Sequence, residues 1–428
     1  MSRRRFLRLG AGLGAALLIG SARSAQALLP PARRGRVVIV GGGWGGLAAA
    51  AHVRKQLPAW EVVLLERAAG FFSLPLSNAW LIDQIPTDFL TRDPVAAAKR
   101  FGYMRIETEV QEIDRVARRV LTAAGALAYD YLVLAPGIAE QTGHWVGDDP
   151  AAMAALQAFD SAFVSSAALA PLKQRLHGFA GGDIVMSVPP TPYRCPPAPY
   201  ERACAIGWWL KTHKIPGRLT VLDPGAGIAS FRSAFDTLFP DQIRFLPFQN
   251  IESVNPFKRI VQTDFDTLHF DTAILAGPQR AGALVARAGL DARDAQGRST
   301  GWADADPRSL QARADERVFV IGDALGLASP LFGHYPKTAH MAVHHGRIAA
   351  AGIAARIHDT AFEPFFPESV CWVTDSFTPH EMIRIDTHYR QRGDGAIAQQ
   401  VEQARENNPR GEEKAWVSGL FGEVFGAA

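Results

Sequence analysis

Three cysteines, Cys195, Cys204 and Cys371, are the residues that could carry redox or nucleophilic chemistry. Cys195 precedes two prolines and an expected helix, and the start of a helix favours the thiolate, which is the nucleophilic form. Cys204 lies in an apolar helical stretch and is expected to be a buried, inert thiol. Cys371 lies 176 residues after Cys195. A disulfide needs Cα atoms within about 4.4 to 6.8 Å, and the sequence alone does not place these two cysteines together.

An acidic residue, Glu201, lies six residues after Cys195, in the first turn of the expected helix Tyr200–Lys211. At this distance its carboxylate can face the thiol as a proton carrier. It can equally favour the helix start electrostatically. Both interpretations remain open at this stage.

A glycine-rich turn near the N-terminus predicts a dinucleotide site. It follows the continuous apolar run Arg36–Val40, which is typical of a strand buried on both faces of a parallel sheet. Glycines let the backbone approach a pyrophosphate, the helix start presents free N–H groups, and Glu66 can hold a ribose hydroxyl. The pattern comprises Gly41, Gly43, Gly46, the helix Leu47–Val53 and the strand Glu61–Leu65.

Two further segments are typical of flavoproteins with two dinucleotide-binding domains. Tyr129–Gly137, YDYLVLAPG, would be a buried strand that ends in a glycine turn. Arg317–Asp323, RVFVIGD, would be the strand whose Asp323 reaches the ribityl chain of FAD, although Asp323 could also cap a helix from Ala324. The predicted FAD-binding residues are Gly41, Gly43, Gly46, Glu66, Arg67, Val110, Pro136, Gly137, Gly322, Asp323, Pro336 and Lys337.

A second βαβ unit lacks the glycine fingerprint. Its expected strands are Asp183–Val188 and Leu219–Asp223, with the helix Tyr200–Lys211 between them. The place of the glycine turn is taken by Ser187–Arg202, SVPPTPYRCPPAPYER. Because proline has no N–H to offer a phosphate, we predict that this unit does not bind NAD(P)H and that reducing equivalents come from another donor.

The first 27 residues are expected to be a twin-arginine signal peptide, cleaved near Ala27, which predicts a periplasmic protein. Ser2–Leu7 has the twin-arginine pattern, Gly10–Gly20 is a short apolar run and Ala25–Ala27 is a cleavage signal. The alternative is an uncleaved anchor, but a membrane span needs about 20 apolar residues. Without these residues, 40 Lys and Arg face 42 Asp and Glu, a formal net charge of −2. This balance argues against binding to nucleic acid or to an anionic membrane.

The predicted fold class is α/β: two Rossmann-like domains of the glutathione or disulfide reductase flavoprotein type, plus a C-terminal α+β closing domain. After the signal peptide at 1–27, the predicted parts are an FAD-binding domain at 28–150 and 255–364, a second Rossmann-like domain at 151–254 and a closing domain at 365–428. The C-terminal helix would pack over the cofactor side or dock on a membrane. The residues that would do either are Trp416, Leu420, Phe421 and Phe425.

Over nearly the whole mature chain, these motifs resemble the flavoprotein subunit of flavocytochrome c sulfide dehydrogenase, a family related to the sulfide:quinone oxidoreductases. The proline and cysteine loop Ser187–Arg202 is the most specific motif, since generic flavin reductases do not share it. The other matching segments are VIVGGGWGG from Val38, YDYLVLAPG from Tyr129, GPQRAG from Gly277, VIGDA from Val320, YPKTAH from Tyr335 and AWVSGLFGEVFG from Ala415.

The resemblance implies a redox disulfide between Cys195 and Cys371 above the flavin. Sulfide would open this bond to form a persulfide, and the electrons would pass through FAD to a haem on a c-type cytochrome subunit. The chain has no C-x-x-C-H haem site, so the haem would belong to that partner. Glu201 matches the acid after the family's first cysteine. Lys337 matches a basic residue near the flavin pyrimidine edge, although a surface cation is the alternative. No metal site is predicted.

One departure from the family concerns the covalent flavin tether. The expected cysteine is replaced by Leu74, with Ser73 beside it, in FFSLPLSNAW. We therefore predict noncovalent FAD. Three alternatives remain open: a sulfide:quinone oxidoreductase, an NAD(P)H-linked reductase, which the proline loop opposes, and a flavin-containing binding or assembly protein without turnover.

Overall fold

The structure is a computed structural model that describes residues 26–426 of the 428-residue chain. Nearly all of the predicted signal peptide, residues 1–25, lies outside the described residues. The twin-arginine pattern, the apolar run and the cleavage signal therefore remain predictions. Among residues 26–426, no helix combines the length and the apolar character that crossing a bilayer requires.

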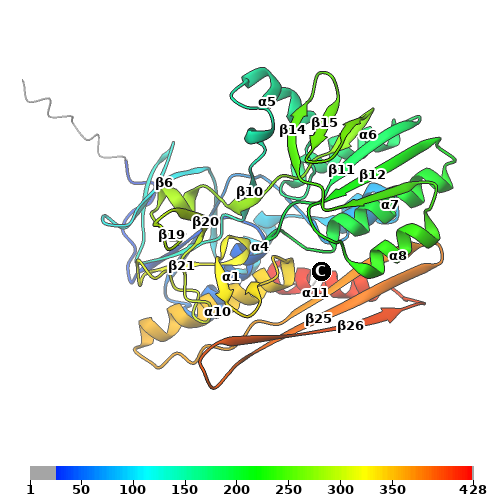
Figure 1. The fold of residues 1–428 in the computed structure, drawn as a ribbon. Coiled ribbons are helices and arrows are strands. Elements are labelled where there is room, and N and C mark those ends of the chain that lie inside the picture. Colours follow the sequence, from blue (N-terminus) through cyan, green and yellow to red (C-terminus); the bar gives the residue numbers. More distant parts are fainter. Residues whose placement is uncertain (1–25, 427–428) are drawn as a thin grey trace, which may run out of the picture.

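The first sheet places the predicted FAD site at the ends of buried parallel strands. Its order is β21-β9-β1-β2-β5, and all neighbouring strands are parallel. Val37, Val38 and Ile39 are fully buried, as a strand covered on both faces requires. Helices α1 and α10 pack against each other in this part of the molecule (Figure 1). The bounds are β1 Arg36–Val40, α1 Trp44–Gln56, β2 Glu61–Glu66, β5 Met104–Glu107, β9 Tyr131–Leu134, β21 Val318–Val320 and α10 Ala339–His358.

The second sheet is also parallel and carries the proline loop. Its order is β13-β12-β11-β17, and its central strands β11 and β12 are buried from their third residue onward. The prediction of a two-Rossmann α/β fold is confirmed by these two sheets. The bounds are α6 Leu169–His177, β11 Gly182–Ser187, α7 Ala198–Thr212, β12 Gly217–Asp223, α8 Ala229–Leu238, β13 Ile243–Pro247 and β17 Thr272–Ile274.

Smaller elements lie along the chain between the strands of each sheet. Two of them are three-stranded antiparallel sheets, and one is a short helix, α2, that lies against α6 and α7. Their bounds are α2 Ser77–Leu81, α4 Pro94–Phe101, β6 Val110–Asp114, β7 Arg119–Thr122, β8 Gly125–Ala128, β14 Ile251–Asn255, β15 Ile260–Thr263 and β16 Thr267–His269.

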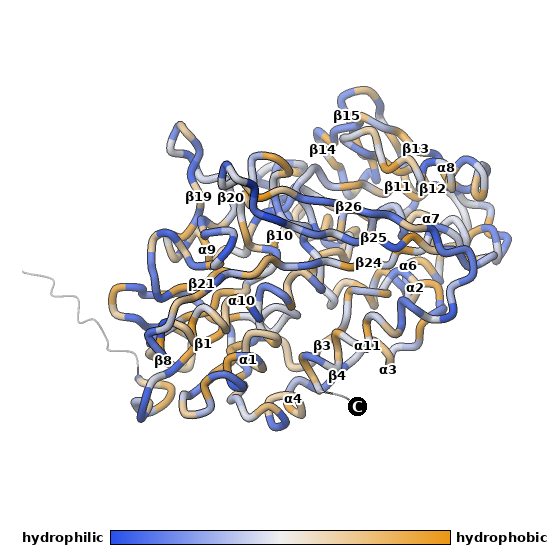
Figure 2. The backbone as a smooth tube through the Cα atoms, turned by 90° about the horizontal axis from the view of Figure 1, so that it is seen from below, coloured by the Kyte–Doolittle hydropathy of each residue, from blue (hydrophilic) through white to orange (hydrophobic). Residues whose placement is uncertain are grey.

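The C-terminal part forms a long antiparallel sheet, β24-β25-β26, and a final helix. Figure 1 shows β25 and β26 running side by side along one side of the molecule, below α8. Figure 2 shows that β26 is largely hydrophilic, in keeping with its exposed residues. Strand β24 instead faces α7 and α10. The bounds are β24 Ser369–Phe377, β25 His380–Gln391, β26 Ile397–Glu406 and α11 Glu412–Phe425.

Helix α11 packs against the protein rather than offering a membrane-docking face. Leu420, Phe421 and Phe425 are buried, and α11 contacts α1 and α4. The Phe421 ring stacks on Trp44 with 5.2 Å between ring centroids. The packed alternative for this helix is therefore the one that the structure shows.

Candidate active site

The Cys195 loop is held in an uncommon backbone conformation. Cys195 has φ of +49°, in the left-handed region that residues other than glycine rarely adopt and that occurs often at functional sites. Its N–H donates to the carbonyl oxygen of Lys337 at 3.0 Å, and its own carbonyl accepts from the N–H of Ala198, the first residue of α7, at 2.8 Å. The loop is thus bound both to the segment before α10 and to the helix that follows it.

Cys371 lies beside Cys195 despite the separation along the chain. It is the third residue of β24, and its thiol lies next to that of Cys195, close enough for the two groups to act on each other electrostatically. This contact is the main cause that holds the pKa of the Cys371 thiol well above its usual value, and burial adds to the shift. Both thiols are free, as is Cys204, which is fully buried in α7 as expected. The structure therefore brings the two predicted redox cysteines together as a dithiol.

Arg194 binds the cysteine loop to the predicted flavin segment. Its Nε donates to Oδ2 of Asp323 at 2.6 Å, and its Nη1 donates to the carbonyl oxygens of Phe163 and Val164 at 3.1 and 3.0 Å. Asp323 is the middle residue of the short 3-10 turn Gly322–Ala324, and no helix starts at Ala324. The capping alternative for Asp323 was therefore wrong, because its carboxylate pairs with Arg194 instead.

Glu201 connects the two cysteine-bearing elements. Its Oε1 accepts from the N–H of Thr374 in β24 at 2.8 Å, and its Oε2 accepts from Nδ2 of Asn78 in α2 at 2.6 Å. Burial raises the pKa of Glu201 to about 6, although these two hydrogen bonds and the charge of Arg202 oppose the shift. Glu201 does lie in the first turn of α7, but its two hydrogen bonds go to β24 and α2. A carboxyl group with this pKa can exchange protons near neutral pH.

Arg202 and Asn78 complete this buried network, and the sequence interpretation assigned a role to neither of them. Arg202 is 1% exposed, donates through Nε to Oδ1 of Asn78 at 2.9 Å and through Nη1 to the carbonyl of Ser161. Its guanidinium carbon lies 3.7 Å from the ring centroid of Phe163. Burial lowers the pKa of Arg202 to about 9. Their position in the sequence could have indicated a role, because Asn78 lies in the family motif LSN and Arg202 lies at the end of the proline loop, in PYER.

Lys337 is a buried cation next to the same turn. Its side chain is 3% exposed, so the surface-cation alternative was wrong. Its Nζ donates to the carbonyl oxygens of Asp323 and Leu325 at 2.8 and 3.0 Å, and lies 3.8 Å from the ring centroid of Trp302. Burial lowers the pKa of Lys337 to about 7, against the opposing effect of Asp323. Because this pKa lies near neutral pH, a small change in the groups around Lys337 is enough to change whether its amine carries a charge.

The glycine turn after β1 has the shape that a dinucleotide requires. A Cβ added at Gly46 would lie 1.8 Å from the carbonyl oxygen of Gly41, so only glycine permits this approach of helix to turn. A Cβ at Gly43 would meet no atom within 4 Å, which leaves the backbone open to a pyrophosphate. Glu66 reaches this turn, since its Oε2 accepts from the N–H of Gly42 at 2.5 Å. These residues fit the adenosine half of FAD.

The remaining predicted FAD-binding residues lie on several elements. Gly137 and Gly322 both have positive φ, 66° and 70°, and Arg194 approaches the Cβ position of Gly137. Arg67 is exposed and forms an ion pair of 3.5 Å with Glu109, whereas Val110 is buried at the start of β6. Pro136 follows β9, and Pro336 directly precedes Lys337.

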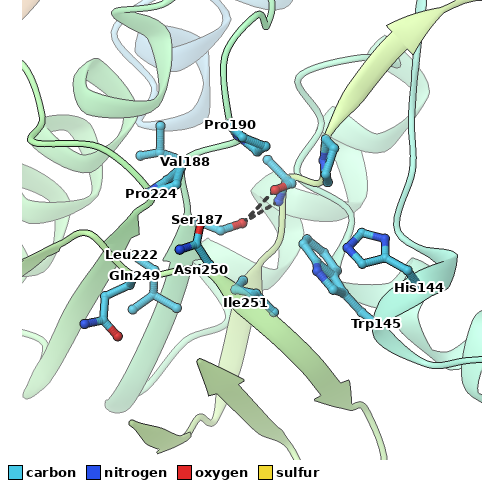
Figure 3. Close-up of a pocket in the computed structure, with 12 residues that line it drawn as sticks. His144, Trp145, Ser187, Val188, Pro190, Leu222, Pro224, Gln249, Asn250 and Ile251 are labelled. Atoms are coloured by element: carbon cyan, nitrogen blue, oxygen red, sulfur yellow. Dashed lines mark hydrogen bonds between the residues drawn. The ribbon is translucent and has the colours of Figure 1, made fainter. Parts of the chain in front are cut away.

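The crevice of the second Rossmann unit is poorly suited to a dinucleotide phosphate. A cavity of about 190 Å³ lies at the carboxyl ends of its strands (Figure 3), and among the described residues neither Lys nor Arg lines it. Ser187 is engaged by hydrogen bonds to the backbone of Ala276. Asp223, the acid at the end of β12, accepts from the Tyr200 hydroxyl at 2.5 Å. Asp223 thus has hydrogen-bond partners just as Glu66 does in the first unit, so it is the prolines in place of glycines that disfavour a dinucleotide phosphate.

Comparison with known proteins agrees with this geometry. Residues 170–275 match the family model for the central part of the flavocytochrome c sulfide dehydrogenase flavoprotein chain, and residues 35–176 match that for pyridine nucleotide-disulphide oxidoreductases. The flavocytochrome c sulfide dehydrogenase flavoprotein chain of Chlorobaculum thiosulfatiphilum is 48% identical over 44 residues, which are 10% of this chain and 92% of that sequence. This chain belongs to the flavocytochrome c sulfide dehydrogenase flavoprotein family.

Members of neighbouring families share the fold or part of the sequence. Mitochondrial sulfide:quinone oxidoreductase of Mus musculus is 22% identical over 68% of this chain and 66% of its own length. The sulfide:quinone oxidoreductase structure from Aquifex aeolicus superposes with a TM-score of 0.72 at 19% identity and covers 92% of both chains, which shows a common fold. The NAD(P)H sulfur oxidoreductase of Pyrococcus abyssi is 34% identical over 24% of this chain, which spans only 25% of that relative.

Membership in the flavocytochrome c sulfide dehydrogenase flavoprotein family places the chain among flavin-dependent sulfur oxidoreductases and implies FAD as cofactor. The family resemblance seen in the sequence is confirmed. The roles of the individual residues stay predictions. What the structure adds is the position of the two thiols relative to Glu201, Arg194 and Lys337.

Proposed function

We propose that this chain is an FAD-dependent dehydrogenase of sulfide, or of a related small sulfur anion, that uses Cys195 and Cys371 as a redox disulfide. The observation that carries the proposal is the contact between the two thiols, which lie 176 residues apart in the chain and beside the segment that carries Asp323. Two thiols that meet without a structural need are expected to be chemically active.

The sulfur chemistry uses the protein's own thiols. Hydrosulfide attacks the Cys195–Cys371 disulfide, so that one cysteine becomes a persulfide and the other leaves as a thiolate. When the Cys195–Cys371 bond forms again, the S–S bond of the persulfide breaks, and the outer sulfur leaves in the zero oxidation state together with one proton and two electrons. FAD, when bound, accepts the two electrons. Glu201, whose charge also acts on the Cys371 thiol, takes up the proton, because its raised pKa lets it exchange protons near neutral pH.

Several residues would hold the cofactor. The glycine turn Gly41–Gly46 and Glu66 would bind the adenosine and pyrophosphate part, as their geometry supports. Asp323 would bind the ribityl chain, and Lys337 would stabilise negative charge on the reduced flavin. FAD would be noncovalent, since Leu74 takes the place of the tethering cysteine.

The proposed electron acceptor is a c-type cytochrome subunit in the periplasm, which the twin-arginine pattern and the family name both support. A quinone acceptor is the second candidate, since sulfide:quinone oxidoreductases share the fold. It is disfavoured because Leu420, Phe421 and Phe425, which would form the apolar quinone surface, are buried. Mixing the sulfide-reduced protein with cytochrome c and with decylubiquinone in parallel distinguishes the two, and faster oxidation by the quinone would reverse this preference.

Anaerobic titration of the oxidised holoprotein with sulfide tests the proposal. We expect sulfide to bleach the visible flavin absorbance of the wild type and of Cys204→Ser, because Cys204 is buried in α7. We expect Cys195→Ser and Cys371→Ser to lose this reaction. Bleaching of the Cys195→Ser variant at the wild-type rate would overturn the proposal and leave a flavin-binding or assembly protein.

A further inference from the structure

We propose that His340 is a positioning residue that holds Cys371 opposite Cys195. The inference rests on the proposed function in one respect, namely that the two cysteines cycle between a dithiol and a disulfide. His340 lies in the motif YPKTAH, in which only Pro336 and Lys337 had an expected role.

The first observation concerns the free edge of β24. This strand pairs with β25 on one side only, because it is the outer strand of its sheet. On the other side, the N–H of Val370 donates to Nδ1 of His340 at 2.8 Å, and the N–H of Thr374 donates to Glu201 at 2.8 Å. Along this free edge, side chains thus take the place of a neighbouring strand both before Cys371, at Val370, and after it, at Thr374.

Two further contacts hold the residues just before Cys371. The N–H of Glu368 donates to Nδ1 of His344 at 3.3 Å, one helical turn after His340. The Ser369 hydroxyl lies 3.2 Å from that of Thr338. Of these contacts, that of His340 is the shortest and the nearest in sequence to Cys371.

The second observation is that the same segment binds the other cysteine. The backbone carbonyl oxygen of Lys337, three residues before His340, accepts a hydrogen bond from the N–H of Cys195 at 3.0 Å. Helix α10, which begins at Ala339, packs along α1 and is therefore a firm support. The short segment from Lys337 to His340 thus contacts both cysteine segments, through Lys337 on one side and through Thr338 and His340 on the other. Since a disulfide tolerates only a narrow range of Cα separations, these contacts decide how easily the bond closes.

The contact also defines the chemical state of the imidazole. A backbone N–H can only donate, so Nδ1 of His340 must be unprotonated. Burial is the main cause that lowers the pKa of His340, which favours this neutral form. The charged and titratable groups around it are His344, Arg347, Glu368 and Glu423. A side chain that places an acceptor where Nδ1 lies should therefore substitute for His340.

The test measures thiol–disulfide exchange in a Cys204→Ser background, so that only the Cys195–Cys371 pair reports. The two thiols are equilibrated with oxidised dithiothreitol, which takes up the two hydrogens as the disulfide forms, and the products are counted by mass after alkylation. We expect His340→Leu to lower the equilibrium constant for disulfide formation by about tenfold, which corresponds to about 30 mV.

Matched variants separate positioning from general packing. His340→Asn places its carboxamide oxygen near the Nδ1 position and should retain the wild-type constant, whereas His340→Gln carries the oxygen further out and should share the defect of His340→Leu. His358→Leu changes an exposed histidine at the far end of α10 and should have no effect. Because His340→Gln keeps a polar side chain, it serves as the informative variant if His340→Leu does not fold.

The outcomes have distinct meanings. The role of His340 would be overturned if His340→Leu and His340→Gln both kept the wild-type equilibrium constant for disulfide formation. It would also be overturned if both variants lowered this constant and His340→Asn lowered it as well. Either result would leave the proposed function intact. If the wild-type pair forms no disulfide in this exchange, the proposed function itself is wrong, and the role of His340 falls with it.

Discussion

Arg194 Nε lies 2.6 Å from Oδ2 of Asp323, so the residue next to Cys195, the first predicted redox cysteine, is paired directly with the residue predicted to reach the ribityl chain of FAD. The carbonyl of Asp323 also accepts from Nζ of Lys337. Cysteine loop and cofactor segment are therefore one connected unit, and a change at Asp323 is expected to affect both.

The substitution Asp323→Asn tests this connection. The amide would keep the shape of the side chain but lose the charge that pairs with Arg194, and a hydrogen bond to a charged group contributes about 1.5 kcal/mol or more. We expect FAD affinity to fall about tenfold, measured by flavin fluorescence during dilution of the holoprotein. Asp304→Asn, which removes an exposed ion pair with Arg313, is the control and should retain FAD. Unchanged affinity in Asp323→Asn would argue against a cofactor role.

Glu201 should give sulfide oxidation a pH dependence. Because its pKa is raised to about 6, the carboxylate becomes available as proton acceptor as the pH rises through 6. Glu201→Gln should lose this rise and reduce the rate of flavin bleaching about 100-fold. Stopped-flow measurement of the bleaching between pH 5 and 8 checks both effects. A wild-type pH profile in Glu201→Gln would assign the proton to another group.

The same pKa shift has a consequence for stability. A carboxyl group whose pKa is raised on folding contributes stability that is present below pH 4.5 and is lost as the pH rises through about 6. The free energy of unfolding of Glu201→Gln should therefore fall less over this interval than that of the wild type. Glu316→Gln, which changes an exposed carboxylate, should behave as the wild type does.

Asn78 is expected to stabilise the buried side chains of Glu201 and Arg202 through its hydrogen bonds to both. Asn78→Ala leaves Oε2 of Glu201 and Nε of Arg202 without these partners inside the protein. We expect a loss of about 3 kcal/mol in the free energy of unfolding, measured in urea. Because the hydrogen bond from Asn78 lowers the pKa of Glu201, the pH-dependent rise in activity should also move to higher pH. A loss below about 1 kcal/mol would mean that water replaces the amide.

FAD should be released when the protein is precipitated with acid. The side chain at the expected tether position is the hydrocarbon of Leu74, and the hydroxyl of its neighbour Ser73 is buried and donates to the carbonyl of Pro75 at 3.0 Å. Neither can form a thioether. Yellow flavin should therefore appear in the supernatant after precipitation, and flavin that stays with the pellet would contradict noncovalent binding.

NADH should not reduce the flavin under anaerobic conditions. The crevice of the second Rossmann unit has prolines in place of the phosphate-binding glycines, and among the described residues neither Lys nor Arg lines its cavity. The visible flavin spectrum after addition of NADH checks this expectation. Sulfide added to the same sample is the positive control, and bleaching by NADH alone would show that the crevice still accepts the nucleotide.

Local patterns in the sequence were enough to predict the parts whose geometry depends on neighbouring residues. The turn from Gly41 to Gly46 and the return of Glu66 to it lie within one βαβ unit, whose glycine spacing and strand length define their arrangement. The sequence also predicted that the second unit lacks a glycine turn, because such a turn is a local pattern within one βαβ unit. A single apolar helix likewise predicted that Cys204 is buried.

Contacts between distant segments depended on how the sheets and helices pack, which no local pattern contains. The meeting of Cys195 with Cys371 was implied by family resemblance alone, and the contact of Glu201 with Thr374 was not foreseen. The burial of Lys337 was likewise left undecided. Side-chain spacing along one element specifies which faces are apolar, but only the packed tertiary structure determines which residue of another element faces them. That packing is what places one strand edge, one loop and the start of α10 around two thiols.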